Sequence, residues 1–147
     1  MIKLIASDLD GTLLDNNSQL SKENRDAVAE ALAQGITFTL STGRMFQSAA
    51  PFARDLGLGP QQPLICYNGA LIRRLSGEIL YEQPLAPELS QMVVDYGQRR
   101  GWTINAYFQD QLYVSSVNQK ARDYALRSRV SVTAVGDLVH FVEEGKK

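Results

Sequence analysis

Short apolar runs alternate with helical periodicity over the first part of the chain. The runs near residues 2–6, 36–40 and 63–67 predict short buried strands, because each consists of apolar residues and is followed by polar or turn-forming ones. Between them, apolar positions at helical spacing predict helices over about 21–34 and 45–56. A strand, a helix and a second strand in this order predict a right-handed crossover between parallel strands. The first part is therefore expected to be an α/β domain.

Capping and turn residues mark the ends of these predicted elements. Ser21 is a favoured helix N-cap, and Gly35 is well placed to end the same helix. Pro51 is expected to kink the second helix or to mark its true beginning. Asn68 and Gly69 form the dipeptide most typical of a tight hairpin turn. A hairpin is therefore predicted after the third strand.

The pattern changes near Pro84. Pro87 predicts the start of an amphipathic helix that Gly101 ends. Residues 102–108 alternate between apolar and polar side chains, which predicts a half-buried strand with an antiparallel return at 112–114. Further capping residues, Asn118 and Asp137, predict two more helices on either side of a strand at 130–135. We therefore expect domains at residues 1–84 and 85–147, the second of α+β type.

Composition narrows the class of protein. The 147 residues are 44% hydrophobic and 21% charged, which is ordinary for a soluble globular protein. A net charge of −1 gives no electrostatic argument for nucleic acid or for an anionic membrane surface. No apolar run is long enough to span a bilayer. Cys66 is the single cysteine, so no internal disulfide is possible, and we expect a cytoplasmic location.

The strongest candidate for chemistry is the pair of carboxylates at Asp8 and Asp10, directly after the first predicted strand. Open α/β sheets bind ligands at the carboxyl ends of their strands. Strand-like alternation places both carboxylates on one side and turns Leu9 into the core. Two adjacent carboxylates repel each other unless a cation lies between them, and hard oxygen ligands suit Mg²⁺. The alternative is a solvated turn, which the apolar residues on both sides disfavour.

A second polar segment, Ser41–Arg44, follows the second predicted strand and lies at the same edge of the sheet. Its hydroxyls and backbone N–H groups are suited to hold a phosphate at the start of the next helix. The simpler reading is that Ser41 and Thr42 only cap that helix. Arg44 has a further alternative, a structural ion pair.

Three motifs together resemble those of the haloacid dehalogenase (HAD) superfamily of phosphohydrolases. Residues 8–14, D-L-D-G-T-L-L, resemble its first motif, and S-T-G-R at Ser41–Arg44 resembles its second. I-C-Y-N-G-A at Ile65–Ala70 resembles the Cof-type sugar-phosphatase branch. The likeness runs along the whole chain but covers only about the first half of such a protein. It implies a Rossmann-like parallel-sheet core followed by part of an α+β cap domain.

The resemblance implies a Mg²⁺-dependent phosphomonoester hydrolase acting on small phosphorylated metabolites such as sugar phosphates. Asp8 would be the nucleophile and form an aspartyl-phosphate, and Asp10 the general acid and base. Mg²⁺ would be held by the Asp8 carboxylate and the backbone carbonyl of Asp10. The residues expected to bind the phosphate are Gly11, Thr12, Thr42, Gly43, Arg44 and Asn68, of which Asn68 could equally be only a turn residue.

Two other functions remain open. A phosphotransferase of the mutase type would use the same two aspartates with a different acceptor. A non-enzymatic phosphoaspartate switch would need the phosphorylated aspartate on a later strand than its acidic pair, whereas Asp8 and Asp10 share one strand. His140 is the single histidine and lacks the context of a serine or cysteine hydrolase. The sequence identifies neither the substrate nor the oligomeric state.

The resemblance also predicts what these residues lack. The family's third motif, a lysine, and its fourth, an acidic pair, would follow the cap. Gly136 and Asp137 begin like the fourth motif without an acidic partner before Glu143, and Lys146 and Lys147 are expected to be a solvated tail. We therefore expect a fragment that needs the remainder of the core, binds Mg²⁺ weakly and has little activity alone.

Overall fold

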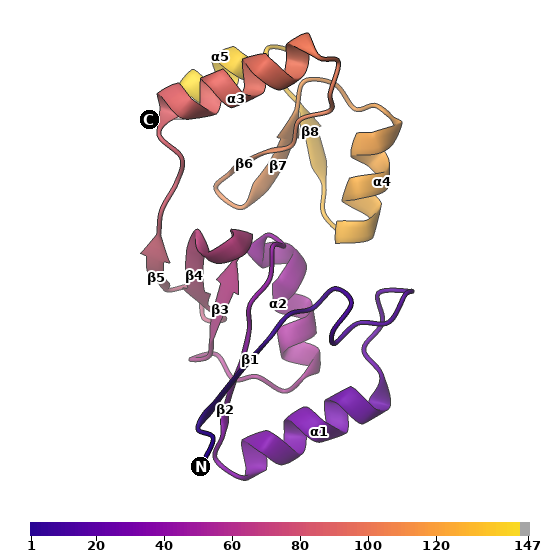
Figure 1. Cartoon of the computed structure of the whole chain (residues 1–147), viewed down its shortest axis with the longest axis vertical. Coiled ribbons are helices and arrows are strands. Elements are labelled where there is room, and N and C mark those ends of the chain that lie inside the picture. Colours follow the sequence, from indigo (N-terminus) through magenta and orange to yellow (C-terminus); the bar gives the residue numbers. More distant parts are fainter. Residues whose placement is uncertain (145–147) are drawn as a thin grey trace. The chain divides into compact units, whose positions relative to one another are not determined.

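The computed structural model describes residues 1–144 and divides them between two compact units, Met1–Gln83 and Pro84 onward. This division lies beside the domain boundary expected after residue 84. Each unit is described by itself (Figure 1). The expected solvated tail at Lys146 and Lys147 lies outside the described residues.

The first unit contains short strands and helices in the predicted order. Its strands are β1 (Leu4–Ser7), β2 (Thr37–Leu40), β3 (Pro63–Cys66), β4 (Leu71–Arg74) and β5 (Ile79–Glu82). Its helices are α1 (Lys22–Ala33), α2 (Phe46–Asp55) and the short 3₁₀ helix η1 (Tyr67–Gly69). The α/β class expected from the sequence is confirmed.

The sheet topology brings the ends of β1, β2 and β3 together. β1 and β2 are parallel, with Leu4 opposite Thr37, as a crossover through α1 requires. Beyond β2, Ser41 forms a parallel bridge with Ile65 of β3. β3, β4 and β5 then form an antiparallel meander. A second hairpin, with Gly77 in its turn, joins β4 and β5.

β1 is less buried than its sequence predicts. Ile5 and Ser7 are partly buried, whereas Leu4 is 58% exposed and Ala6 is also exposed. The reason lies in the pairing, because within the described residues β1 has a strand neighbour on one side only, β2. An edge strand with one covered face shows this alternation of burial.

The core of the first unit lies around α2 and the first strands. Its fully buried side chains are Leu9, Leu40, Ala49, Ala53, Leu64 and Cys66, each 0% exposed. Cys66 therefore packs as a small hydrophobic residue, as its sequence context indicates. The loop after β1 is anchored in this core by Leu9, and the loop after β2 begins directly after the buried Leu40.

The helix ends confirm some predictions and correct others. The Ser21 side chain accepts a hydrogen bond from the Asn24 amide, and Gly35 has φ of +75° after α1. α2 begins at Phe46, so a beginning at Pro51 is wrong. Pro51 lies exposed inside α2, where the missing N–H costs one hydrogen bond while the apolar side of the helix stays buried.

The loop between β3 and β4 is longer than a two-residue hairpin turn. Cys66 pairs with Leu71, which leaves residues 67–70 in the loop. Tyr67 and Asn68 have φ of +51° and +55° and form η1 with Gly69. Asparagine tolerates this left-handed conformation better than most residues, whereas tyrosine does not.

The second unit has a small mixed sheet and three helices among its described residues. Its elements are α3 (Pro87–Arg99), β6 (Ala106–Phe108), β7 (Gln111–Val114), α4 (Gln119–Ser128), β8 (Val132–Ala134) and α5 (Leu138–Glu144). β6 and β7 are antiparallel, and β8 lies parallel to β7. α3 packs against α5. The strand expected over residues 102–108 is wrong in length, since only its last three residues pair with β7.

Capping in the second unit follows the sequence closely. The Asn118 side chain accepts from the Ala121 amide at 3.0 Å, and Asp137 accepts from the His140 amide at 3.0 Å. Asp110 lies in the tight turn between β6 and β7 with φ of +58°. Across the described residues, no helix combines the length and the apolar character that crossing a membrane would need.

Candidate active site

The candidate site is built at the carboxyl edge of β1, β2 and β3. Ser7 and Leu40 end their strands opposite each other, and the Ser41 amide donates to the Ser7 carbonyl at 2.9 Å. The Thr42 amide donates to the Ile65 carbonyl at 2.9 Å. The loops that leave these strands therefore begin side by side, which is where an open α/β sheet binds ligands.

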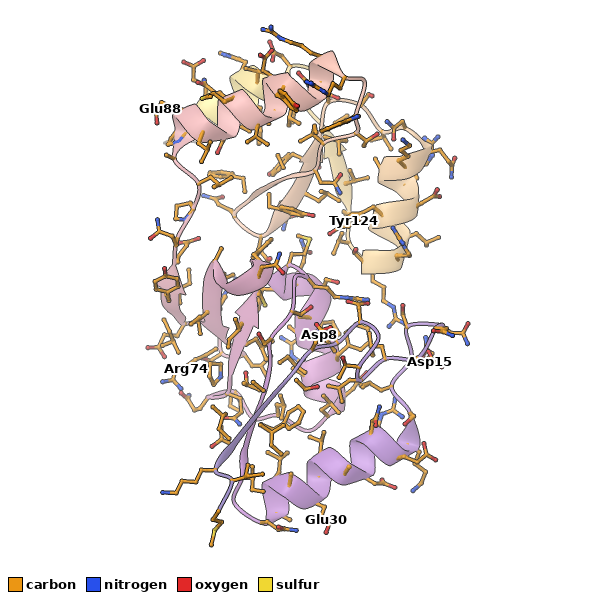
Figure 2. The ribbon with its side chains drawn as sticks, viewed as in Figure 1. Asp8, Asp15, Glu30, Arg74, Glu88 and Tyr124 are labelled. Carbon is orange, nitrogen blue, oxygen red and sulfur yellow. The ribbon has the colours of Figure 1, made fainter. Side chains whose placement is uncertain are left out.

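The loop after β1 is held by one buried residue. Leu9 is 0% exposed, and its carbonyl accepts from the amides of Leu13 at 3.1 Å and Leu14 at 2.9 Å. Asp8 and Asp10, on either side of Leu9, are both exposed, as alternation predicts. Asp8 follows directly on β1 (Figure 2).

The next two candidates complete this turn. Gly11 has φ of +76°, a conformation that glycine adopts without strain, and Thr12 follows it on the surface. The Thr12 amide lies 3.4 Å from the Leu9 carbonyl, so the backbone closes over that oxygen. Both residues thus shape the loop that carries the two aspartates, and their predicted part in phosphate binding stays a prediction.

Arg44 contacts Asp10 directly through two hydrogen bonds. Its Nε donates to Oδ2 and its Nη2 to Oδ1, each at 2.7 Å. This is the side-on fork in which both carboxylate oxygens are bound by one guanidinium. The Arg44 side chain is 11% exposed and that of Asp10 is 55% exposed. The first and second motifs therefore meet in an ion pair, one of the alternatives that the sequence leaves open for Arg44.

Two residues that the sequence does not single out support Arg44. Its Nη1 lies 3.3 Å from the Ser48 hydroxyl, and its guanidinium carbon lies 5.2 Å from the centre of the Phe52 ring. Ser48 is 2% exposed and Phe52 is 3% exposed. The signal in the sequence is their spacing, because residues four and eight positions after Arg44 lie on one side of α2.

Thr42, Gly43 and Asn68 form a tightly connected corner. The Thr42 hydroxyl accepts from the Arg44 amide at 3.2 Å, so its own O–H remains a donor for a ligand. The backbone N–H of Asn68 donates to the Thr42 carbonyl at 3.2 Å, and the backbone N–H of Tyr67 donates to the Arg44 carbonyl at 3.0 Å. A side-chain carbon at Gly43 would lie 3.0 Å from Asn68 Oδ1, so glycine allows this close approach.

The donor set is compatible with a hard divalent cation. Asp8 offers an exposed carboxylate, whereas both carboxylate oxygens of Asp10 are bound to Arg44. If Asp10 binds the cation, this arrangement therefore favours its backbone carbonyl as the ligand rather than its carboxylate. Among the described residues no group of three or more His, Cys, Asp or Glu side chains is placed to hold a metal. Oxygen ligands from few residues plus water are typical of Mg²⁺.

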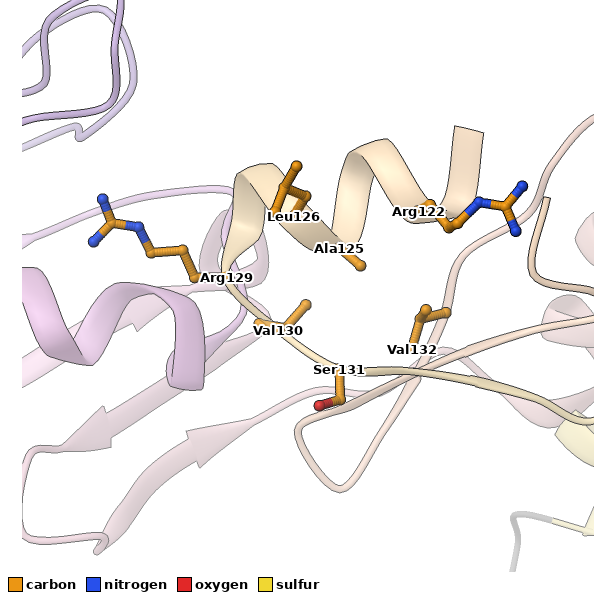
Figure 3. Close-up of a pocket in the computed structure, with 7 residues that line it drawn as sticks. All are labelled: Arg122, Ala125, Leu126, Arg129, Val130, Ser131 and Val132. Atoms are coloured by element: carbon orange, nitrogen blue, oxygen red, sulfur yellow. The ribbon is translucent and has the colours of Figure 1, made fainter. Parts of the chain in front are cut away.

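The second unit has a pocket of its own between α4 and β8, lined by apolar side chains and Ser131 (Figure 3). Arg122 and Arg129 line its ends and point away from each other, so they do not converge on one anion. His140 lies on α5 with an exposed side chain, its Nδ1 4.0 Å from the Glu143 carboxylate. Neither feature is a catalytic constellation.

Comparison with known proteins supports the resemblance seen in the motifs. A family described as haloacid dehalogenase-like hydrolase matches residues 5–139. The chain is 32% identical over 111 residues to a 5-amino-6-(5-phospho-D-ribitylamino)uracil phosphatase of Bacillus subtilis, covering 76% of this chain and 37% of that protein. It is 38% identical over 98 residues to the HMP-PP phosphatase of Klebsiella pneumoniae, covering 64% of this chain and 34% of that protein.

Solved structures share the fold. A haloacid dehalogenase-like hydrolase from Bacteroides thetaiotaomicron superposes with a TM-score of 0.84 at 24% identity, over 95% of this chain and 54% of that one. A protein from Thermotoga maritima superposes with a TM-score of 0.79 at 26% identity, over 98% of this chain and 53% of that one. The chain therefore spans about half of these structures, and about a third of the two curated relatives above.

Proposed function

Because the chain belongs to the haloacid dehalogenase-like hydrolase family, we propose that it carries the nucleophile and the acid–base residue of a Mg²⁺-dependent phosphomonoester hydrolase. The observation that carries this proposal is the exposed pair Asp8 and Asp10 at the end of β1, beside the Thr42 corner. We propose small phosphorylated metabolites such as sugar phosphates as substrates. Two relatives are named as phosphatases of small phosphorylated compounds, which supports this class.

In the proposed reaction an Asp8 carboxylate oxygen attacks phosphorus, and the bond from phosphorus to the leaving oxygen breaks. Asp10 gives a proton to the leaving alkoxide. Asp10 then takes a proton from the water that attacks the aspartyl-phosphate, which releases phosphate and restores Asp8. Splitting the displacement into two steps in this way is covalent catalysis, and both residues lie on the same loop.

Hydrogen-bond donors of this site would balance the negative charge of the phosphate. The Thr42 hydroxyl and the backbone N–H groups of this corner would bind the oxygens on which negative charge accumulates. Gly11 and Thr12 belong to the loop that carries the two aspartates, and the Asn68 backbone amide is bonded to the Thr42 carbonyl, so all three would lie beside the phosphate. The Asp8 carboxylate and the Asp10 carbonyl would hold Mg²⁺, which when bound offsets the repulsion between nucleophile and phosphate.

We further propose that the lysine and the acidic pair of the family's later motifs come from polypeptide beyond these 147 residues. The chain covers 37% and 34% of the two curated relatives named above, which supports this proposal. Asp8, Asp10 and a phosphate dianion together would otherwise meet with few balancing cations. A mutase-type phosphotransferase remains the second candidate, since it would use the same two aspartates.

The test is phosphate release from an aryl phosphate with Mg²⁺, using the chain alone and the chain supplied with the remainder of such a protein as a separate polypeptide. We expect turnover only with the remainder, and its loss by many orders of magnitude in Asp8→Asn, because the nucleophile carries the first chemical step. Retention of a tenth of the activity in Asp8→Asn would exclude Asp8 as nucleophile. Transfer to an added sugar phosphate in preference to water would favour the mutase.

A further inference from the structure

We propose that Arg44 is a positioning residue that holds the Asp10 carboxylate in one orientation, rather than a ligand of the substrate phosphate. The inference rests on the proposed function, because the direction of the Asp10 carboxylate matters to the reaction only if Asp10 is its acid and base. It assigns to Arg44 a role different from the phosphate binding that the second motif implies.

The geometry of the fork is the first argument. Both carboxylate oxygens of Asp10 are bound at 2.7 Å, by Nε and Nη2 on one edge of the guanidinium. A single hydrogen bond would let the carboxylate rotate, whereas a planar fork fixes its plane and direction. The third nitrogen, Nη1, faces the Ser48 hydroxyl at 3.3 Å. To bind a phosphate through the same fork, Arg44 would have to release Asp10.

Burial identifies which partner sets the position of the other. The Arg44 side chain is 11% exposed, with Phe52 beside its guanidinium and Ser48 at its far nitrogen. Its backbone is fixed as well, because its amide donates to the Thr42 hydroxyl and its carbonyl accepts from the Tyr67 amide. Asp10 lies on an exposed loop with a 55% exposed side chain. The arginine is thus the anchored member of the pair.

This placement has a chemical consequence. The fork uses one lone pair of each Asp10 oxygen, so a second lone pair remains to carry the proton that Asp10 gives to the leaving alkoxide or takes from the attacking water. A general base must lie within hydrogen-bond reach of that water, and a displacement of about 1 Å can cost about a hundredfold in rate. Asp10 lies on the loop after β1, where a bridge to Leu14 holds the main chain and the fork from Arg44 holds the carboxylate. Arg44 supplies this restraint from the segment between β2 and α2.

The direct test is the side-chain rotamer of Asp10, measured in the full chain from three-bond NMR couplings to its side-chain carboxyl carbon. We expect one rotamer in the wild type and an average over several in Arg44→Gln. Arg44→Lys keeps the charge without the fork and should also show averaging. Arg54→Gln, the same change at an exposed position of α2, is the matched control and should leave one rotamer. A single Asp10 rotamer in Arg44→Lys would overturn the proposal, and Arg44→Lys decides if Arg44→Gln fails to fold.

A kinetic test separates positioning from phosphate binding, using the chain supplied with its remainder. We expect Arg44→Lys to lower kcat about tenfold to a hundredfold while KM changes less than about threefold. A rise in KM with unchanged kcat would instead make Arg44 a phosphate ligand and overturn the proposal. If no preparation turns over, the proposed function fails, and the rotamer measurement still decides the role of Arg44.

Discussion

α2 and α3 are both amphipathic helices, but they bury their apolar side chains very differently. In α2 the apolar residues Phe46, Ala49, Phe52 and Ala53 are all buried against the first unit's core. In α3 the matching stripe of Leu89, Met92, Val93 and Tyr96 is between 45% and 68% exposed.

A different side of α3 is buried instead. Val94 is 4% exposed, and Gly97 is buried close to Ile104. Helical spacing of apolar residues therefore predicts an apolar face, but it does not predict whether another element packs against that face. The two side chains that support Arg44, Ser48 and Phe52, therefore lie on the helix whose apolar face is covered.

The largest expected effect is a pair of identical substitutions that tests this contrast. Leu56 follows α2 and is 4% exposed, whereas Leu89 on α3 is 45% exposed. Leu56→Ala should destabilise its unit by about 2–5 kcal/mol, because it removes buried methyl groups and leaves a cavity. Leu89→Ala should change stability by less than about 1 kcal/mol. Urea unfolding followed separately in each unit measures both values. Equal losses of stability would show that the two leucines do not differ in burial as described.

A smaller effect is expected on the buried side of α3. A side-chain carbon at Gly97 would lie 2.4 Å from Ile104 Cδ1, so the isoleucine must move. Overpacking costs about 1–3 kcal/mol and the gain in helix propensity is about 1 kcal/mol, so Gly97→Ala should destabilise by about 1 kcal/mol. In an Ile104→Ala background the same change should stabilise the unit. Thermal unfolding of the wild type, the two single variants and the double variant gives the coupling energy between the two positions, and additive effects would show that Ile104 does not obstruct the new side chain.

The smallest effect concerns Tyr107 on β6, whose hydroxyl donates to that of Tyr124 on α4 at 2.7 Å. Burial raises the pKa of Tyr107, and the hydrogen bond to Tyr124 raises that pKa further. Because the folded pKa lies above the unfolded one, this stabilisation is complete below about pH 10 and is lost as the pH rises further.

Tyr107→Phe should therefore cost about 1 kcal/mol at neutral pH and progressively less above pH 10. Unfolding curves from pH 7 to 12 measure the difference between the variant and the wild type. A constant difference across that range would show that folding does not raise the pKa of Tyr107. Tyr113→Phe is the control, since Tyr113 lies in the same sheet with its ring against Phe141.

Much of the fold could be predicted because its signals are local. Leu9 points into the core between two exposed aspartates because alternation along an extended chain decides it. The caps at Ser21, Asn118 and Asp137 depend on a side chain that reaches three residues ahead. Such features need no knowledge of distant parts of the chain.

The rest depends on contacts between distant residues. The exposure of Leu4 follows from which strand lies beside β1, and the length of β6 follows from which of its residues pair with β7. The fork between Arg44 and Asp10 needs the ends of two strands and the start of α2 in place. The sequence offers both residues and the possibility of an ion pair, but their pairing is a property of the assembled sheet.

That ion pair also bears on the order in which the protein folds. It joins residues 34 positions apart in the sequence, across the whole crossover formed by β1, α1 and β2. Contacts of this separation require a large loop to close before they return any stabilisation. We expect a partly folded chain to carry both aspartates while Asp10 still rotates freely. Fixing of the Asp10 carboxylate is then a late event in folding, which takes place only once the crossover is complete.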